Sequence, residues 1–467
     1  MSEYIRVKGN IIEKTGGVSR VYAKGGIEHN SKGKIEYFAE SYSYGEPEKP
    51  PIKIIDGAVK EIELLTALDQ GSDNAKSDKS QPGMIFGNTY HFKVKSYIKN
   101  PPINLLNIKW MLKYHSLSQN KWLEIPLSAK GDSVKITLND EDMCGRYIYV
   151  RAYVSNPETE AEYKEWMHNR FRWFNRLKIH QQIKDRVKDP WKISQEYSSL
   201  CGMAALFYIM IKRDPKAYEK LAKQLFRTGQ YKIDTYIIKP HEKALSMYET
   251  KTTDANYKSM RMQEIDWIVL ATTRSGESLN DQFVYNGFEN SDMDMIKAVN
   301  WPDMLTRMCK EVAGYANAES FGLNLLSIKD KKGIGAKAHD YVSNSDLLEL
   351  QTINKKYNAG HTILMMIDSD MIEDVSSYDP KNLTTNSHWV VYEGGLTFFD
   401  VHGNITTKVN EVEKVFFSIY TWGFDPVTQI DEFGNDDNKY KRPLIYKKQS
   451  ISTKSFKSNY YGYIEAF

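Results

Sequence analysis

The chain has 467 residues, enough for about three domains and a large buried core, which excludes a small disulfide-stapled or fibrous protein. Its 63 basic and 60 acidic residues give a net charge of +3, so neither nucleic acid nor an anionic membrane surface is the expected partner. The three cysteines, Cys144, Cys201 and Cys309, fit neither a disulfide framework nor a paired metal-ligand spacing. We expect a reduced protein that needs no metal and no cofactor.

The N-terminal sequence carries no secretory signal, because the first residues are polar and no apolar run follows them. The longest uninterrupted apolar run, Met203 to Ile211, is about half as long as a membrane-spanning helix requires. We therefore expect no membrane span, and synthesis as a soluble cytoplasmic protein.

Glycine recurs with a period of eight in residues 1–51, the first predicted module. The four glycines are Gly9, Gly17, Gly25 and Gly33. One glycine per short unit suits stacked strands, where it permits a tight turn or a close backbone approach. The alternative is a glycine-rich hairpin pair whose spacing is accidental. A proline-rich break, Pro47 to Pro51, closes the module.

Residues 52–156 contain alternating apolar and polar runs with turn residues near their ends, at 89–97, 108–114, 133–138 and 147–154. Such runs predict a small antiparallel, Ig-like β-sandwich. It shows no catalytic constellation, so adhesion, spacing or docking is its expected role. Residues 157–192 interleave charged and aromatic residues at roughly helical spacing and predict a linking helix before a C-terminal domain at 193–467.

Cys201 opens the apolar run of the C-terminal domain, which predicts a helix buried on all sides. Ser198 or Ser199 could cap this helix, and the free backbone N–H groups of its first turn would favour the thiolate of Cys201. Gln195, six residues earlier, could place an amide beside the helix start and bind an oxyanion. A buried structural cysteine is the alternative interpretation of Cys201.

A nucleophilic cysteine needs a base that is close in space rather than in sequence, and His388 is the candidate. It begins a predicted strand that turns at Gly394-Gly395 into a second strand ending at Asp400. In that hairpin Asp400 would orient the imidazole of His388, with Asn404 as the reserve candidate for this role. A half-exposed structural histidine and a turn carboxylate are the alternatives.

Glutamine, cysteine at a helix start, histidine and an acidic residue follow one another in the order Gln195, Cys201, His388 and Asp400. This order and the spacing from glutamine to cysteine resemble the papain-like cysteine peptidase superfamily, over about residues 193–467. The sequence from Leu200 to Ala205 and the sequence of the N-terminal module resemble those of secreted type VI effectors of Bacteroidota. The resemblance implies a papain-like domain behind an all-β region, an α+β fold overall.

The expected function is that of a secreted antibacterial or anti-host toxin with a cysteine peptidase or amidase domain, whose substrate is an amide in protein or peptidoglycan. Residues 1–51 would dock on a spike or tube component of a contractile secretion system, which would carry the protein into a target cell, and an immunity protein would protect the producer. Two alternatives remain open: a glutamine deamidase or transglutaminase with the same triad, and a non-catalytic structural component of the secretion apparatus.

Overall fold

The computed structural model describes residues 57–72, 81–196, 198–245, 262–278, 283–289, 291–323, 345–373, 387–421, 423 and 450–467. It contains both helices and sheets, with 34% of the described residues helical and 31% in strands, which confirms the mixed α+β class. The glycine-rich segment 1–51 lies outside the described residues, so its repeat stays a prediction.

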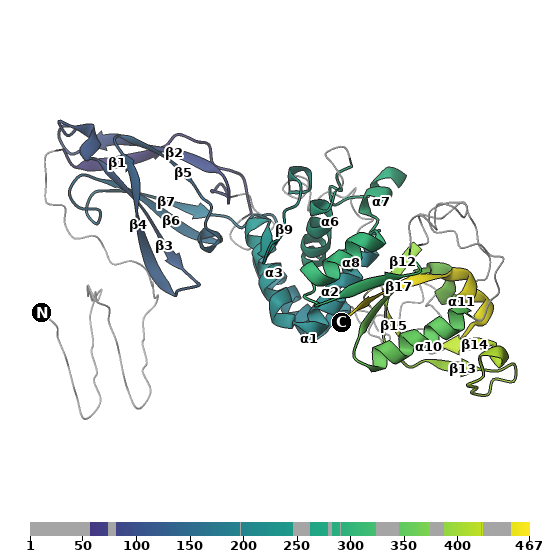
Figure 1. The fold of residues 1–467 in the computed structure, drawn as a ribbon. Helices are drawn as coiled ribbons and strands as arrows, with labels where there is room; N and C mark the ends of the chain where they lie inside the picture. Colours follow the sequence, from purple (N-terminus) through teal and green to yellow (C-terminus); the bar gives the residue numbers. More distant parts are fainter. Residues whose placement is uncertain are drawn as a thin grey trace, which may run out of the picture.

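Two antiparallel sheets pack face to face as a β-sandwich, seen at the left of Figure 1. One sheet has the order β1 (Val59–Leu64), β2 (Thr89–Tyr97), β5 (Ser133–Thr137), and the other the order β4 (Lys121–Lys130), β3 (Lys109–Ser116), β6 (Arg146–Tyr153), β7 (Ala161–Met167). Alternate side chains of both sheets point inward, and Phe92, Trp110 and Val150 are buried in a shared core.

The predicted linking helix over 157–192 is wrong in its first half. Residues Ala161–Met167 form β7, which pairs along its whole length with β6 and completes the sandwich. The sequence there alternates with period two, since Ala161 and Met167 are buried while Lys164 is exposed. The helix itself, α1, spans only Arg176–Lys188 and is capped by the side chain of Asn175.

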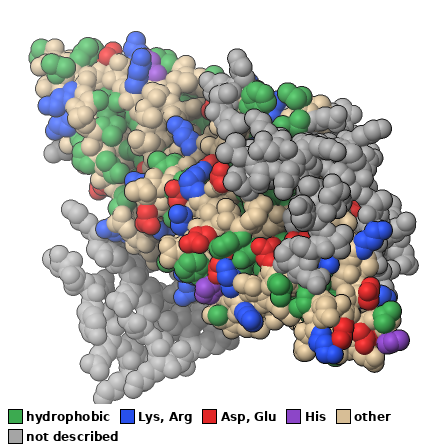
Figure 2. Space-filling model, turned by 45° about the vertical axis from the view of Figure 1, so that its right-hand side comes forward, with side chains coloured by type: hydrophobic (Ala, Val, Ile, Leu, Met, Phe, Trp, Pro, Cys, Tyr) green, Lys and Arg blue, Asp and Glu red, His purple; other side chains and the backbone are tan. Residues whose placement is uncertain are grey.

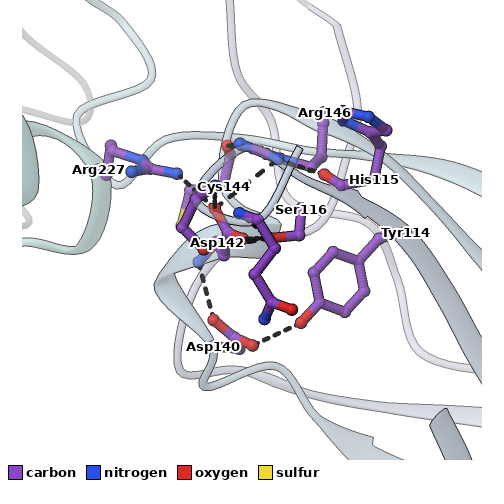
Figure 3. A network of polar contacts seen from close by, with 10 residues as sticks. Tyr114, His115, Ser116, Asp140, Asp142, Cys144, Arg146 and Arg227 are labelled. Atoms are coloured by element: carbon purple, nitrogen blue, oxygen red, sulfur yellow. Dashed lines mark hydrogen bonds and ion pairs between the residues drawn. The ribbon is translucent and has the colours of Figure 1, made fainter. Parts of the chain in front are cut away.

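A polar network joins the sandwich to the helices that follow (Figure 3). Asp142 lies in the sandwich, 3.9 Å from the guanidinium of Arg146 and 3.6 Å from that of Arg227, at the end of α3 (Pro215–Thr228). Tyr114 donates a hydrogen bond of 2.6 Å to Asp140, whose other oxygen accepts the backbone N–H of Asp142. These contacts fix the sandwich against α3.

Further helical segments follow α1 in the described chain: α3, the continuous run α5 (Glu264–Asp266), π-helix (Trp267–Ala271) and α6 (Thr272–Gly276), and α8 (Pro302–Glu311). The buried helix expected from the apolar run at Cys201 is α2 (Cys201–Arg213), in which residues 201–211 are all buried. α7 spans Asp292–Ala298.

A five-stranded antiparallel sheet lies beside these helices, at the right of Figure 1. Its order is β10 (Ala318–Phe321), β17 (Tyr460–Ala466), β11 (Thr362–Asp368), β12 (Ser387–Tyr392), β15 (Ile419–Tyr420). The last residues of the chain thus form β17, which lies between β10 and β11. Side chains of β11 and β12 alternate between two cores, one shared with α2 and the other with α10 (Ser345–Asn358) and α11 (Thr453–Asn459).

The hairpin predicted between His388 and Asp400 does not form. Although β12 carries His388, the next strand, β13 (Thr397–Phe399), belongs to a separate three-stranded sheet with β14 (Lys414–Phe416) and β16 (Ile451–Ser452). Gly394 and Gly395 both have positive φ, 79° and 74°, and redirect the chain out of the five-stranded sheet.

The surface mixes charge signs over the described part of the face shown in Figure 2, where Lys and Arg lie among Asp and Glu. Hydrophobic side chains gather on the sandwich at the upper left. Trp122 of β4 and Tyr147 of β6 are among the exposed large hydrophobic residues of the sandwich. Among the described residues, no helix has both the length and the apolar character needed to span a bilayer.

Candidate functional site

Cys201 is the first residue of α2, as expected, but the predicted serine cap is wrong. The N-cap is Leu200, which makes no side-chain capping bond. Ser198 donates its hydroxyl to the backbone oxygen of Gln195 at 2.7 Å, and Ser199 donates its hydroxyl to the carboxylate of Glu289 at 2.8 Å. The same carboxylate accepts the backbone N–H of Ser199 at 2.9 Å, so an anion from a distant loop takes the serine's place near the positive helix end.

Asn300 also holds the start of α2. Its side-chain oxygen accepts the backbone N–H of Met203 at 3.0 Å, and its backbone oxygen accepts the indole N–H of Trp389 at 3.0 Å. Gly202 permits this contact, because a Cβ built there would lie 2.5 Å from Cβ of Asn300 and 2.7 Å from Leu305. One residue thus joins the helix start to strand β12.

The sulfur of Cys201 reaches β12 at the residue after His388. It lies within hydrogen-bonding reach of the backbone N–H of Trp389, and the N–H groups of Gly202 and Cys201 face it from the helix. A strand's N–H groups point sideways in the plane of the sheet. The sulfur therefore lies beside the backbone of β12, at the residue that follows His388.

Burial dominates the acidity of Cys201. It raises the pKa of the thiol to about 11, although the three N–H groups stabilise the thiolate, and the Glu289 carboxylate adds to the rise. The expected thiolate is therefore wrong for the resting protein. The helix end lowers the pKa, but excluding water from the thiol, which is 7% exposed, outweighs it.

His388 is buried at the start of β12, and its Nε2 hydrogen-bonds the hydroxyl of Thr421, the residue that follows β15. Its exposed fraction is 5%, and burial lowers the pKa of the imidazole to about 3. The ring is therefore neutral near pH 7. Trp389 packs in the core with α2, so strand alternation turns the side chain of His388 to the other face of β12.

Asp400 does not orient His388, which corrects that prediction. Its carboxylate accepts the backbone N–H groups of His402 and Asn404 and the side-chain N–H of Asn404, at 2.9, 2.8 and 3.2 Å. These bonds lower the pKa of Asp400. Asn404, the reserve candidate, belongs to the same exposed turn. The hairpin reasoning failed because β13 leaves the sheet that holds His388.

Gln195 is buried in the loop before α2. Its side-chain amide donates to the backbone oxygen of Ser198 at 3.1 Å, and the backbone of the next residue, Glu196, turns through a positive φ of 48°. An amide nitrogen has two hydrogens, and this bond uses one of them. The loop thus holds the amide donor of Gln195 against the backbone of Ser198, close to the start of α2.

Two buried residues, Asp266 and Tyr420, hydrogen-bond the backbone of this loop. Asp266, in α5, accepts the backbone N–H of Ser194 at 3.2 Å and two bonds of 2.9 and 2.8 Å from Arg186 of α1. Burial raises the pKa of Asp266, and the Arg186 guanidinium opposes that rise. Tyr420 donates its hydroxyl to the backbone oxygen of Ile193. The loop is therefore tied to both the helices and the sheet.

The sequence does not point to four further side chains of the candidate site: Asp266, Glu289, Asn300 and Thr421. Each hydrogen-bonds the loop before α2, the first turn of α2 or His388. Nothing in the sequence indicates which polar residues near α5 and α8 point at the site.

The described residues contain no group of three or more His, Cys, Asp or Glu side chains that could hold a metal ion. Cys144, Cys201 and Cys309 are free thiols, and all three are buried. In comparisons with known proteins, the chain matches no family model, no curated protein and no solved structure.

Proposed function

We propose that Cys201 and His388 are the nucleophile and the general base of a hydrolase that cleaves an amide bond. The observation that carries this is the contact of the Cys201 sulfur with the backbone N–H of Trp389, the residue next to His388. In sequence the two residues are 188 positions apart (389 minus 201). Convergence of a thiol at a helix start and an imidazole at a strand start is what nucleophilic catalysis needs.

In the proposed reaction His388 takes the thiol proton while the sulfur attacks the carbonyl carbon. The oxyanion of the tetrahedral intermediate is bound by the backbone N–H of Cys201 and by the second amide hydrogen of Gln195. His388 then gives the proton to the leaving amine as the carbon–nitrogen bond breaks, and water hydrolyses the thioester.

The resting pair is neutral, because the Cys201 thiol has a pKa of about 11 and the His388 imidazole one of about 3. The proton therefore moves during the attack rather than before it. Three N–H groups around the sulfur are already placed to stabilise the negative charge that develops there.

The biological part of the proposal is a toxin delivered to a target cell by a contractile secretion system. Its support is the sequence of residues 1–51 and the resemblance to Bacteroidota effectors. We also propose the finer fold assignments: an Ig-like sandwich, supported by seven antiparallel strands around one core, and a papain-like catalytic domain, supported by α2 packing on a sheet whose β12 bears the histidine. The sandwich would then space the catalytic domain from the docking module.

The test is expression of the full chain in the periplasm and, separately, in the cytoplasm of susceptible bacteria. We expect wild type to stop growth, and Cys201→Ala and His388→Gln to abolish the effect. Cys309→Ala is the matched control, because Cys309 is an equally buried thiol in α8 and should keep toxicity. Toxicity that survives Cys201→Ala at equal protein level contradicts an enzymatic role.

Mass spectrometry of proteins and cell-wall fragments from the intoxicated cells then identifies the reaction. New chain ends indicate amide cleavage within a backbone or peptide stem. A gain of about one mass unit at glutamine, without new ends, indicates deamidation, and cross-linked glutamine indicates transglutamination.

A further inference from the structure

We propose that Thr421 is the positioning residue for His388, so that a neutral hydroxyl does what Asp400 was expected to do. The inference rests on the proposed function, in which His388 is the general base. It assigns a role to a residue far from any motif.

Thr421 stands where strand pairing brings it to His388. β15 pairs with β12 through Tyr420 opposite Val391 and Ile419 opposite Tyr392, and Thr421 is the next residue along the chain. The side chain of Tyr420 packs in the core with α2, so alternation turns Thr421 to the face that His388 also uses. Nε2 of His388 and Oγ1 of Thr421 are in hydrogen-bond contact there.

Both groups are shielded from water, since Thr421 is 1% exposed and His388 is 5% exposed. A hydrogen bond in such surroundings is costly to lose, because water cannot replace it. The contact therefore fixes the direction of the ring more firmly than a bond at the surface would.

The contact also selects the tautomer that a base needs. To accept the thiol proton at Nδ1, His388 must carry its own hydrogen at Nε2. That hydrogen then donates to Oγ1 of Thr421, because a hydroxyl oxygen accepts while its own hydrogen turns elsewhere.

A hydroxyl has a different effect from a carboxylate. It orients the ring but places no negative charge beside it, so it does not hold the imidazole in its charged form. This agrees with the low pKa of about 3 for His388. The proposed enzyme therefore keeps a neutral thiol and a neutral imidazole until substrate arrives.

The experiment compares Thr421→Val, which has nearly the same shape and no hydroxyl, with Thr421→Ser, which keeps the hydroxyl and loses a methyl group. Toxicity of the full chain in the susceptible cells is the first readout. The second is long-range ¹⁵N–¹H NMR of histidine-labelled full-length protein, with the His388 signals assigned by their loss in His388→Gln. In wild type we expect the hydrogen on Nε2.

We expect Thr421→Val to lose the Nε2–H signature of His388 and to lower toxicity about 10- to 100-fold in dose, the cost of leaving one buried polar group unsatisfied. Thr421→Ser should restore both. The proposal is overturned if Thr421→Val keeps the tautomer and the toxicity, or if Thr421→Ser loses as much as valine does. If His388→Gln keeps its toxicity, the proposed function itself is wrong. If His388→Gln loses its toxicity while Thr421→Val keeps it in full, only the role of Thr421 is wrong.

Discussion

Replacing Gly202 by alanine should weaken the start of α2, although alanine is normally the better helix former. In an open helix the change gains about 1 kcal/mol. Here the new Cβ would lie 2.5 Å from Cβ of Asn300 and 2.7 Å from both its oxygen and Leu305. Overpacking costs about 1–3 kcal/mol. Displacing the Asn300 oxygen from the Met203 N–H costs about 1 kcal/mol more, so the net loss is about 1–3 kcal/mol.

Hydrogen exchange of the full-length protein measures this loss locally, because the peptides covering 198–213 report the opening of the helix start. In Gly202→Ala the amide hydrogens of these peptides should exchange faster, by a factor that corresponds to the net loss of stability. The exchange rates of the sandwich peptides should stay unchanged. Asn300→Ala and the double variant complete a mutant cycle, in which contact between the two sites predicts a coupling of at least about 0.5 kcal/mol. Slower exchange in Gly202→Ala, or strict additivity, refutes the packing account.

Three further outcomes follow from the site. Iodoacetamide should alkylate Cys201 faster than Cys144 in the native protein, because burial raises the pKa of both thiols but backbone N–H groups stabilise the thiolate of Cys201 alone; equal rates by peptide mass spectrometry contradict the assignment. Asp266→Asn should destabilise the loop before α2 by about 3–5 kcal/mol, since it leaves the buried Arg186 charge without its partner; unchanged exchange in 193–200 contradicts this. Asp400→Asn should keep full toxicity, because that carboxylate serves only its own exposed turn; a loss would restore its orienting role.

The sequence predicts correctly where Cys201 and His388 stand in the fold, because both lie at the start of strongly patterned elements. The apolar run after Cys201 has no polar face, so a buried helix was its only stable placement, and α2 begins at that cysteine. His388 was found in the same way, at the start of an apolar strand. The acidity of the thiol was misjudged because the sequence shows the helix end but not the depth of burial.

The hydrogen-bond partner of His388 cannot be predicted from the pattern of apolar residues, because strand pairing decides which residue lies beside the imidazole. The nearest downstream acidic residue, Asp400, looked suitable only if β12 and β13 formed a hairpin. The chain instead leaves the sheet at Gly394 and Gly395 and returns to it at β15, which carries Thr421 to the histidine. A similar limit applied to β7, whose aromatic and charged residues fit both a helical and an alternating pattern until pairing with β6 fixed it.

The chain between Cys201 and His388 supplies the residues that hold the loop before α2 and the first turn of this helix. Asp266, Glu289 and Asn300 accept the backbone N–H groups of Ser194, Ser199 and Met203, respectively. The loop is thus held at both ends and along the first turn of α2. A buried thiol with a high pKa gains nothing from its own acidity, so its reactivity must come from fixed donors that stabilise charge during the reaction. If the proposed hydrolase is correct, residues that immobilise the backbone around Cys201 contribute to catalysis without touching substrate, and their loss should lower activity before it unfolds the domain.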